Sequence, residues 1–362
     1  MLAIAAKTGS TQPHLLETEP PRDPRPGELL CRTLELGVCG TDREILHSAK
    51  PWIPPGDDHL ILGHECLARV EAIGPGVTAF QVGNLVVPVV RRALAENSRR
   101  ADLLPFGQYI ERGIVRAHGF SQTLWLDRPE YLFAVPQSIA DLAVLVEPLT
   151  VSEKGASEAL LLTRARLGAA SWTASDPPRV LVTGMGPIAF TALLASLARA
   201  WPVTMLGRDE PTSFRAQLAQ RLGARYQTLD SAAPSPHDVE DQGYDLLLEC
   251  TGDDEVLVHC SSLIRSCGVI LWLGSNRVPQ ATTLNVQQTI REGLLRNHIH
   301  LGCVNAAAPR DFQDALAHLT KLSTDRRPEL SALITARVTP PTSLWHYQHR
   351  EPQGIKTILL YD

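Results

Sequence analysis

The sequence predicts an α/β protein that combines a β-rich domain with a doubly wound parallel sheet. Its pattern changes from strand-like runs to helix and strand alternation near residue 150, and a glycine-rich turn follows a buried strand within 180–189. The 362 residues are 44% hydrophobic, which is enough for two cores. We therefore expect one domain over 1–152 and 305–362 and another over 153–304.

The first part of the chain contains short extended runs that proline and glycine interrupt. These runs are 29–36, 67–73 and 85–90. Such punctuated runs are typical of strands in a β domain, and they predict a barrel-like lobe.

Beyond residue 150, helix candidates and strand candidates alternate. The helix candidates are 152–167, 188–200, 213–222 and 256–264, and the strand candidates are 179–183, 203–206, 246–250 and 269–273. Alternation of this kind indicates parallel strands that helices connect. After a further helix over 310–322, the strand-like tail 331–361 is expected to rejoin the first domain.

The charge of the chain disfavours several classes of partner. Its 34 basic and 39 acidic side chains give a net charge of −5, and no basic run is long enough to follow a phosphate backbone. An export leader and an apolar run of about 18 residues are both lacking, so we expect a cytoplasmic protein. Neither nucleic acid nor a membrane is an expected partner.

A dinucleotide-binding turn is predicted within the second domain. The strand candidate ends directly before the turn Gly184-Met185-Gly186-Pro187-Ile188-Ala189, and a helix candidate follows. Small residues here let backbone amides at the helix start approach a pyrophosphate. The alternative is a purely structural glycine turn, but the flanking strand and helix favour a Rossmann cofactor site.

The end of the next strand bears on the choice of dinucleotide. A carboxylate there binds the ribose of NAD, whereas an arginine accommodates the 2′-phosphate of NADP. The chain has Gly207-Arg208-Asp209, so Arg208 favours NADP over NAD. A shift of one or two residues would instead make Asp209 an NAD ligand, and Arg208 could be an ordinary surface residue.

Four separated side chains in the first domain are metal-ligand candidates. They are Cys39, His64, Glu65 and Glu147. A mixed set of thiolate, imidazole and carboxylate suits a catalytic zinc ion better than a structural one. Each also has a plain structural role available: Cys39 and His64 as core residues, Glu65 as a surface charge, and Glu147 as a cap of the following helix.

The motifs around these residues resemble those of the zinc-dependent medium-chain dehydrogenase/reductase family. The resemblance rests on GVCGTD at 37–42, GHE at 63–65, EPL at 147–149 and GMGPIA at 184–189. Further motifs, including ERGI at 111–114 and GCVN at 302–305, resemble the glucose dehydrogenase branch. The resemblance implies a GroES-like catalytic domain and a Rossmann cofactor domain.

The resemblance also implies roles for individual residues. Cys39 and His64 would hold zinc, Glu147 would be the third ligand, and Glu65 an alternate or water-mediated one. Thr41 would relay the alcohol proton and Asp42 would support the ligands, unless the two only cap a helix. Glu111 and Asn305 would contact sugar hydroxyls, with Asn305 also near the nicotinamide, although ordinary loop hydrogen bonding is the alternative for both.

Two departures from the family pattern narrow the expectation. The stretch 91–107, where the family carries a four-cysteine zinc site, contains no cysteine, so we expect one zinc ion per chain. Valine stands at 90 and 151, where the glucose branch has an asparagine and an acidic residue. Losing those polar groups makes glucose itself doubtful and favours a modified sugar, a cyclitol or another secondary alcohol.

The sequence thus predicts a zinc-dependent oxidoreductase that moves a hydride between NADP, or NAD, and a polyhydroxylated or functionalised secondary alcohol. The alternatives are a simple alcohol dehydrogenase or ketone reductase and a dinucleotide-binding protein without catalysis. By analogy with the family, we expect a homo-oligomer, a dimer or a tetramer.

Overall fold

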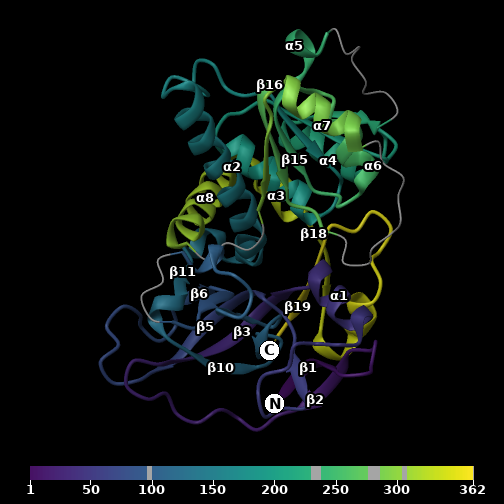
Figure 1. Cartoon of the computed structure of the whole chain (residues 1–362). Helices are drawn as coiled ribbons and strands as arrows, with labels where there is room; N and C mark the ends of the chain where they lie inside the picture. Colours follow the sequence, from purple (N-terminus) through teal and green to yellow (C-terminus); the bar gives the residue numbers. More distant parts are fainter. Residues whose placement is uncertain (96–99, 230–237, 276–285, 304–307, 362) are drawn as a thin grey trace. The chain divides into compact units, whose positions relative to one another are not determined.

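The computed structural model of the chain describes residues 1–95, 100–229, 238–275, 286–303 and 308–361. It contains two compact units: a first unit made of 1–150, 305–323 and 334–362, and a second made of 151–304 and 324–333. Figure 1 shows the chain coloured along its sequence. None of the helices in the described ranges has both the length and the apolar character needed to cross a membrane.

The first unit is rich in strands. Its main strands are β3 (Leu29–Gly37), β5 (Glu65–Ile73), β6 (Leu85–Pro88), β10 (Leu124–Asp127), β11 (Leu132–Ala134), β18 (Ile334–Val338) and β19 (Lys356–Leu360). They form a sheet in the order β11-β6-β5-β3-β19-β18, with β10 also paired to β3. The extended runs expected at 29–36, 67–73 and 85–90 are therefore confirmed as β3, β5 and β6.

The C-terminal tail completes this sheet. Strand β19, yellow in Figure 1, pairs antiparallel with the purple strand β3. Smaller sheets contain β1 (Leu2–Lys7), β2 (His14–Glu17), β4 (His59–Ile61), β7 (Arg91–Ala93), β8 (Tyr109–Arg112) and β9 (Arg116–Ala117). Its shorter helical segments include α1 (Gly40–Ser48) and the 3-10 turns 101–103, 129–131, 137–145, 340–342 and 344–347. The prediction that the tail rejoins the first domain is confirmed.

The second unit contains one parallel sheet. Its strands are β12 (Val180–Thr183), β13 (Val203–Gly207), β14 (Arg225–Thr228), β15 (Tyr244–Glu249), β16 (Ile264–Trp272) and β17 (Ile299–Gly302). The order β14-β13-β12-β15-β16-β17 places the first strand in the middle, so the chain winds outward in both directions. This arrangement confirms the doubly wound parallel sheet.

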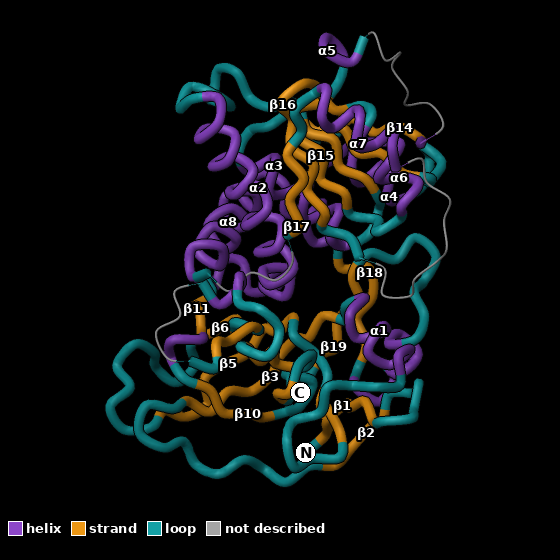
Figure 2. The backbone as a smooth tube through the Cα atoms, viewed as in Figure 1, coloured by secondary structure: helices purple, strands orange, loops and turns teal. Residues whose placement is uncertain are grey.

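Helices cover both faces of this sheet, as Figure 2 shows. The described helices between 146 and 295 are α2 (Val146–Leu167), α3 (Pro187–Ala198), α4 (Phe214–Leu222), α5 (Val239–Gln242), α6 (Asp254–Ser261) and α7 (Val286–Leu295). All four residues of β12 are buried, which requires packing on both faces because successive side chains point to opposite sides. The apolar run in the sequence therefore reflects a central strand.

The boundaries of three helices differ most from those expected. Helix α6 ends at Ser261 because Ile264 already pairs with Tyr244 in the parallel ladder of β15 and β16. Helix α2 begins at Val146, so that Glu147 lies in its first turn. Helix α8 (Pro309–Ser331) extends nine residues beyond 322, past a non-helical Arg326 and an internal proline.

Candidate functional site

The start of helix α1 positions the first metal-ligand candidate. Cys39 is the N-cap residue, and its backbone N–H donates to the carboxylate of Asp42 at 2.9 Å. The same carboxylate accepts a second, longer bond from the backbone of Gly63 at 3.4 Å. Asp42 is completely buried. It therefore both caps α1 and links the loop of Cys39 to the segment that carries His64.

Three of the predicted ligands meet at this place. Atoms of Cys39, His64 and Glu65 that can ligate a metal lie within 4.8 Å of one another. The Nδ1 atom of His64 is 3.6 Å from Asp42 Oδ1 and has no hydrogen-bond partner among the described residues. An imidazole that faces a carboxylate with one nitrogen keeps the other for a metal, which is usual for a zinc-bound histidine.

The electrostatics of this group suit a cation. Burial opposes a positive charge on His64, yet Cys39 and Asp42 together raise its pKa well above the usual range. A thiol, an imidazole and carboxylates are also the donor types that zinc takes in catalytic sites. The residues present thus fit a zinc ion.

Glu147 lies near this group without belonging to it. Among the described residues, the cluster with atoms inside 4.8 Å contains Glu65 but not Glu147. Burial raises the pKa of the Glu147 carboxyl to about 7, and the nearby carboxylates of Glu65 and Glu111 act in the same direction. A cation bound beside Glu147 would favour its ionised form.

Glu65 has a partner that was not expected from the sequence. The ammonium group of Lys356, on β19, donates to both carboxylate oxygens of Glu65, at 2.7 Å to Oε1. Both side chains are 1% exposed. Gly37 makes room for this pair, since a Cβ there would lie 2.0 Å from Glu65 Oε2. The only sequence signal was a lysine beginning an apolar strand, which is weak on its own.

The predicted dinucleotide turn joins β12 to α3. Gly184 has a φ of +94°, which favours glycine, and Gly186 is the N-cap of α3 with Pro187 in the first helical turn. Ala189 is 1% exposed and packs inside the unit. Together with Ile188, these residues leave the helix start without a side-chain cap, and such free amides suit a pyrophosphate.

The two residues that bear on the dinucleotide differ sharply in their surroundings. Arg208 is exposed, with a single surface pair to Asp253 at 3.0 Å. Asp209 is held by two hydrogen bonds from Arg215, at 2.6 and 2.7 Å. Gly207 is required where it stands, because a Cβ would lie 2.6 Å from Met185 Cγ.

The predicted substrate residues are only partly described. Glu111, on β8, is 3% exposed and accepts a hydrogen bond from Arg91 Nε at 2.7 Å. Asn305 lies outside the described residues. Val90 is 1% exposed and its carbonyl accepts from Arg112, while Val151 belongs to the second unit and is 9% exposed.

Known proteins are similar to this chain over nearly its whole length. The family model described as glucose dehydrogenase C-terminus matches residues 140–360, and the one described as alcohol dehydrogenase GroES-like domain matches 25–136. Glucose 1-dehydrogenase of Thermoproteus tenax is 35% identical over 340 residues, which cover 94% of this chain and 93% of that protein. Glucose 1-dehydrogenase 1 of Caldivirga maquilingensis is 35% identical over 340 residues, covering 93% and 92%.

Solved structures agree with these relatives. Haloferax mediterranei glucose dehydrogenase in complex with NADP, Zn and gluconolactone superposes with a TM-score of 0.85 at 30% identity, covering 100% of this chain and 99% of that one. Galactitol-1-phosphate dehydrogenase from Escherichia coli, at 19% identity and a TM-score of 0.77, shares the fold. The GroES-like and Rossmann domains and the prediction of a dehydrogenase are confirmed, and the chain belongs to the zinc-dependent medium-chain dehydrogenase/reductase family, in its glucose dehydrogenase branch.

Proposed function

We propose that the protein oxidises a polyhydroxylated secondary alcohol, a sugar or a close relative of one, with NADP as hydride acceptor and one zinc ion per chain. The observation that carries this proposal is the group of Cys39, His64 and Glu65 beside a buried Asp42. The relatives support it, because they include glucose 1-dehydrogenases and a complex with NADP, Zn and gluconolactone.

Cys39 and His64 would hold the zinc ion, with Glu147 as the third ligand. Glu65 is the weaker candidate because Lys356 already balances its charge, whereas the raised pKa of Glu147 would be lowered by a cation. Bound zinc supplies a Lewis acid that stabilises the alkoxide form of the substrate. No cysteine lies within 91–107 to build a second zinc site.

The protein's own groups would handle the proton and orient the ligands. Thr41, the second residue of α1, would pass the hydroxyl proton of the alcohol toward solvent. Asp42 would hold the imidazole of His64 from behind, which fixes its ring orientation. Bound NADP would supply the acceptor for the hydride that leaves the alcohol carbon, and the alcohol would become a carbonyl compound.

The second unit would bind NADP in preference to NAD. The amides after Gly184 and Gly186 would take the pyrophosphate, and the exposed Arg208 would pair with the 2′-phosphate. Asp209 supports this preference, because a carboxylate held by Arg215 is not presented to a ribose. We assign 153–304 to cofactor binding and the flanking 1–152 and 305–362 to catalysis, with Asn305 near the nicotinamide.

Glu111 and Asn305 would bind hydroxyl groups of the substrate. A buried carboxylate is a strong acceptor for such groups and discriminates against analogues that lack them. The buried Val90 favours a sugar with fewer polar contacts than glucose, and it also keeps a simple alcohol or ketone as the second candidate substrate.

The chain would form a homo-oligomer through the second unit. Strand β17 ends the sheet order, and the neighbouring helix α7 exposes Ile290, Leu294 and Leu295 at 56%, 72% and 70%. An edge strand that pairs with no further strand of the described residues, beside exposed apolar side chains, is suited to pairing with a second copy. Light scattering should find at least a dimer, and Leu294→Asp should shift it toward monomer; a monomeric wild type would refute this assembly.

Zinc content and a substrate panel test the whole proposal. We expect about one zinc ion per chain by elemental analysis, and NADPH formation with at least one sugar, modified sugar or cyclitol. Simple alcohols turned over faster than every polyol would support the second candidate. Cofactor binding without any turnover would instead support a protein without catalysis, and two zinc ions per chain would contradict the single site.

A further inference from the structure

The guanidinium of Arg91 is the direct neighbour of the carboxylate proposed to bind the substrate. Arg91 is 7% exposed, and its Nε atom donates to Glu111 Oε1 at 2.7 Å. Glutamate has three rotatable side-chain bonds, so a carboxylate without such a contact samples several orientations. Arg91 therefore restricts where the acceptor oxygens of Glu111 lie.

Backbone packing places Glu111 beside the ligand-bearing segment of the first unit. The turn after Glu111 contains Gly113, where a Cβ would lie only 2.5 Å from the carbonyl oxygen of Gly63, the residue before His64. The carbonyl of Gly63 also accepts from the backbone of Phe120 at 2.9 Å. This close approach means that the orientation of Glu111 is set within the same packed region as the predicted zinc ligands.

Arg91 also binds the segment that lacks the family's cysteines. Its Nη1 atom donates to the backbone carbonyl of Asp102 at 3.1 Å, and its guanidinium lies 4.0 Å from the ring centroid of Tyr109. Asp102 in turn receives two hydrogen bonds from Arg100, at 2.9 and 2.8 Å. One arginine thus connects the described parts of this segment to the carboxylate of Glu111.

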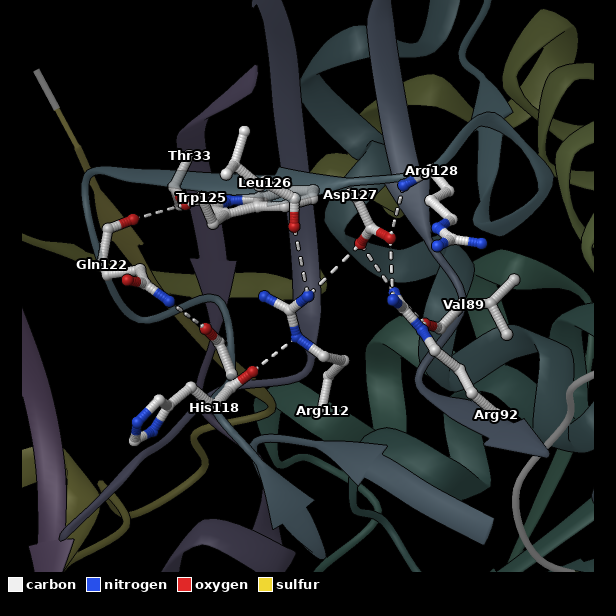
Figure 3. Close-up of polar contacts among 11 residues, drawn as sticks. Thr33, Val89, Arg92, Arg112, His118, Gln122, Trp125, Leu126, Asp127 and Arg128 are labelled. Carbon is white, nitrogen blue, oxygen red and sulfur yellow. Dashed lines mark hydrogen bonds and ion pairs between the residues drawn. The ribbon is translucent and has the colours of Figure 1, made fainter. Parts of the chain in front are cut away.

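The next residue provides a matched control. Arg92 is 8% exposed, binds the carboxylate of Asp127 at 2.7 Å through two nitrogens, and lies 4.2 Å from the ring of Tyr131. Figure 3 shows Asp127 between Arg92 and Arg112. The two arginines therefore share burial, an ion pair and a tyrosine ring, and differ in the carboxylate that they hold.

We propose that Arg91 is a positioning residue for substrate binding, which fixes the Glu111 carboxylate toward the substrate hydroxyls and ties the cysteine-free segment to it. This inference rests on the proposed role of Glu111.

The test compares Arg91→Lys and Arg91→Gln with Arg92→Lys in the zinc-loaded full-length enzyme. Both changes at Arg91 should raise KM for the best polyol about tenfold or more, with a smaller change in kcat. NADP affinity and zinc content should stay at wild-type values. Arg92→Lys should lower the melting temperature about as much as Arg91→Lys does, but its KM should stay at the wild-type value.

A double variant separates positioning from general destabilisation. In a Glu111→Gln background, Arg91→Lys should add little further increase in KM, because the oriented carboxylate is already gone. An unchanged KM in both Arg91 variants, or an equal rise in Arg92→Lys, would overturn the inference while leaving the proposed function intact. If the wild type turns over no polyol, or if Glu111→Gln leaves KM unchanged, the result refutes the proposed function of the site and not the role of Arg91 in particular.

Discussion

Removing the ammonium group of Lys356 should destabilise the first unit severely. Lys356→Met keeps most of the side-chain volume but leaves the Glu65 carboxylate, which is 1% exposed, without its cation. Breaking a buried ion pair from one side costs about 3–5 kcal/mol, since the remaining charge is neither hydrated nor paired. At about 1.4 kcal/mol per factor of ten, the unfolding equilibrium constant should rise roughly 140- to 4,000-fold.

Urea unfolding of the metal-free protein, followed by tryptophan fluorescence, measures this loss. In a unit of this size the same change corresponds to a fall of roughly 6–20 °C in melting temperature. Two controls test whether this loss of stability comes from the unpaired buried charge. Lys7→Met breaks a pair with Asp58 at 4.0 Å whose side chains are 38% and 81% exposed, and should cost no more than about 1 kcal/mol.

The second control removes both charges. Lys356→Met combined with Glu65→Gln should recover most of the stability lost in Lys356→Met, because no uncompensated charge remains. Equal stability of Lys356→Met and wild type would refute the reasoning. So would a double variant that is no more stable than Lys356→Met, since the loss would then come from packing and not from an unpaired Glu65.

Three further predictions concern the metal, the pH and the cofactor. Cys39→Ser should reduce bound zinc from about one ion per chain to almost none; retained zinc would remove Cys39 from the ligand set. Burial raises the pKa of Glu35 to about 7, so its ionisation destabilises the fold, and the stability present below the unfolded-state pKa is lost as pH rises to 7. Glu35→Gln should therefore gain stability over wild type progressively from about pH 4.5 to 7 and hold a constant gain above that range; urea midpoints that differ equally at every pH would contradict this. Arg208→Ser should raise KM for NADP about 10- to 100-fold while leaving KM for NAD unchanged. Arg215→Leu, which releases Asp209, should improve NAD binding, and equal effects of Arg208→Ser on both cofactors would refute the phosphate contact.

Strong local patterns were sufficient to predict the central elements of the fold. The buried runs of β12 and β15 and the turn at Gly184 follow directly from consecutive apolar residues and from small residues at a strand end. Strand β14 was not predicted. Its sequence Arg225–Thr228 has only Tyr226 buried, because an edge strand lacks the apolar run of a central one.

The site was predictable to the extent that it rests on motifs. Cys39, His64 and Glu65 meet as their spacing and neighbours implied. The start of α2 at Val146 was not anticipated, since Pro148 is read from sequence as a helix boundary and here lies inside the first turn. The branch-specific residue Asn305 lies outside the described residues, so its role stays a prediction.

The identity of the elements and of the reactive side chains follows from local sequence, because strand and helix periodicity and glycine geometry act over a few residues. The partner of each buried charge follows only from the tertiary structure. Glu65 pairs with Lys356, which is 291 positions away along the chain, and Glu111 pairs with Arg91, which is 20 positions away. A buried charge must be matched by whatever opposite charge is close in space, and Coulomb energy depends on that distance and on the local dielectric, not on separation along the chain.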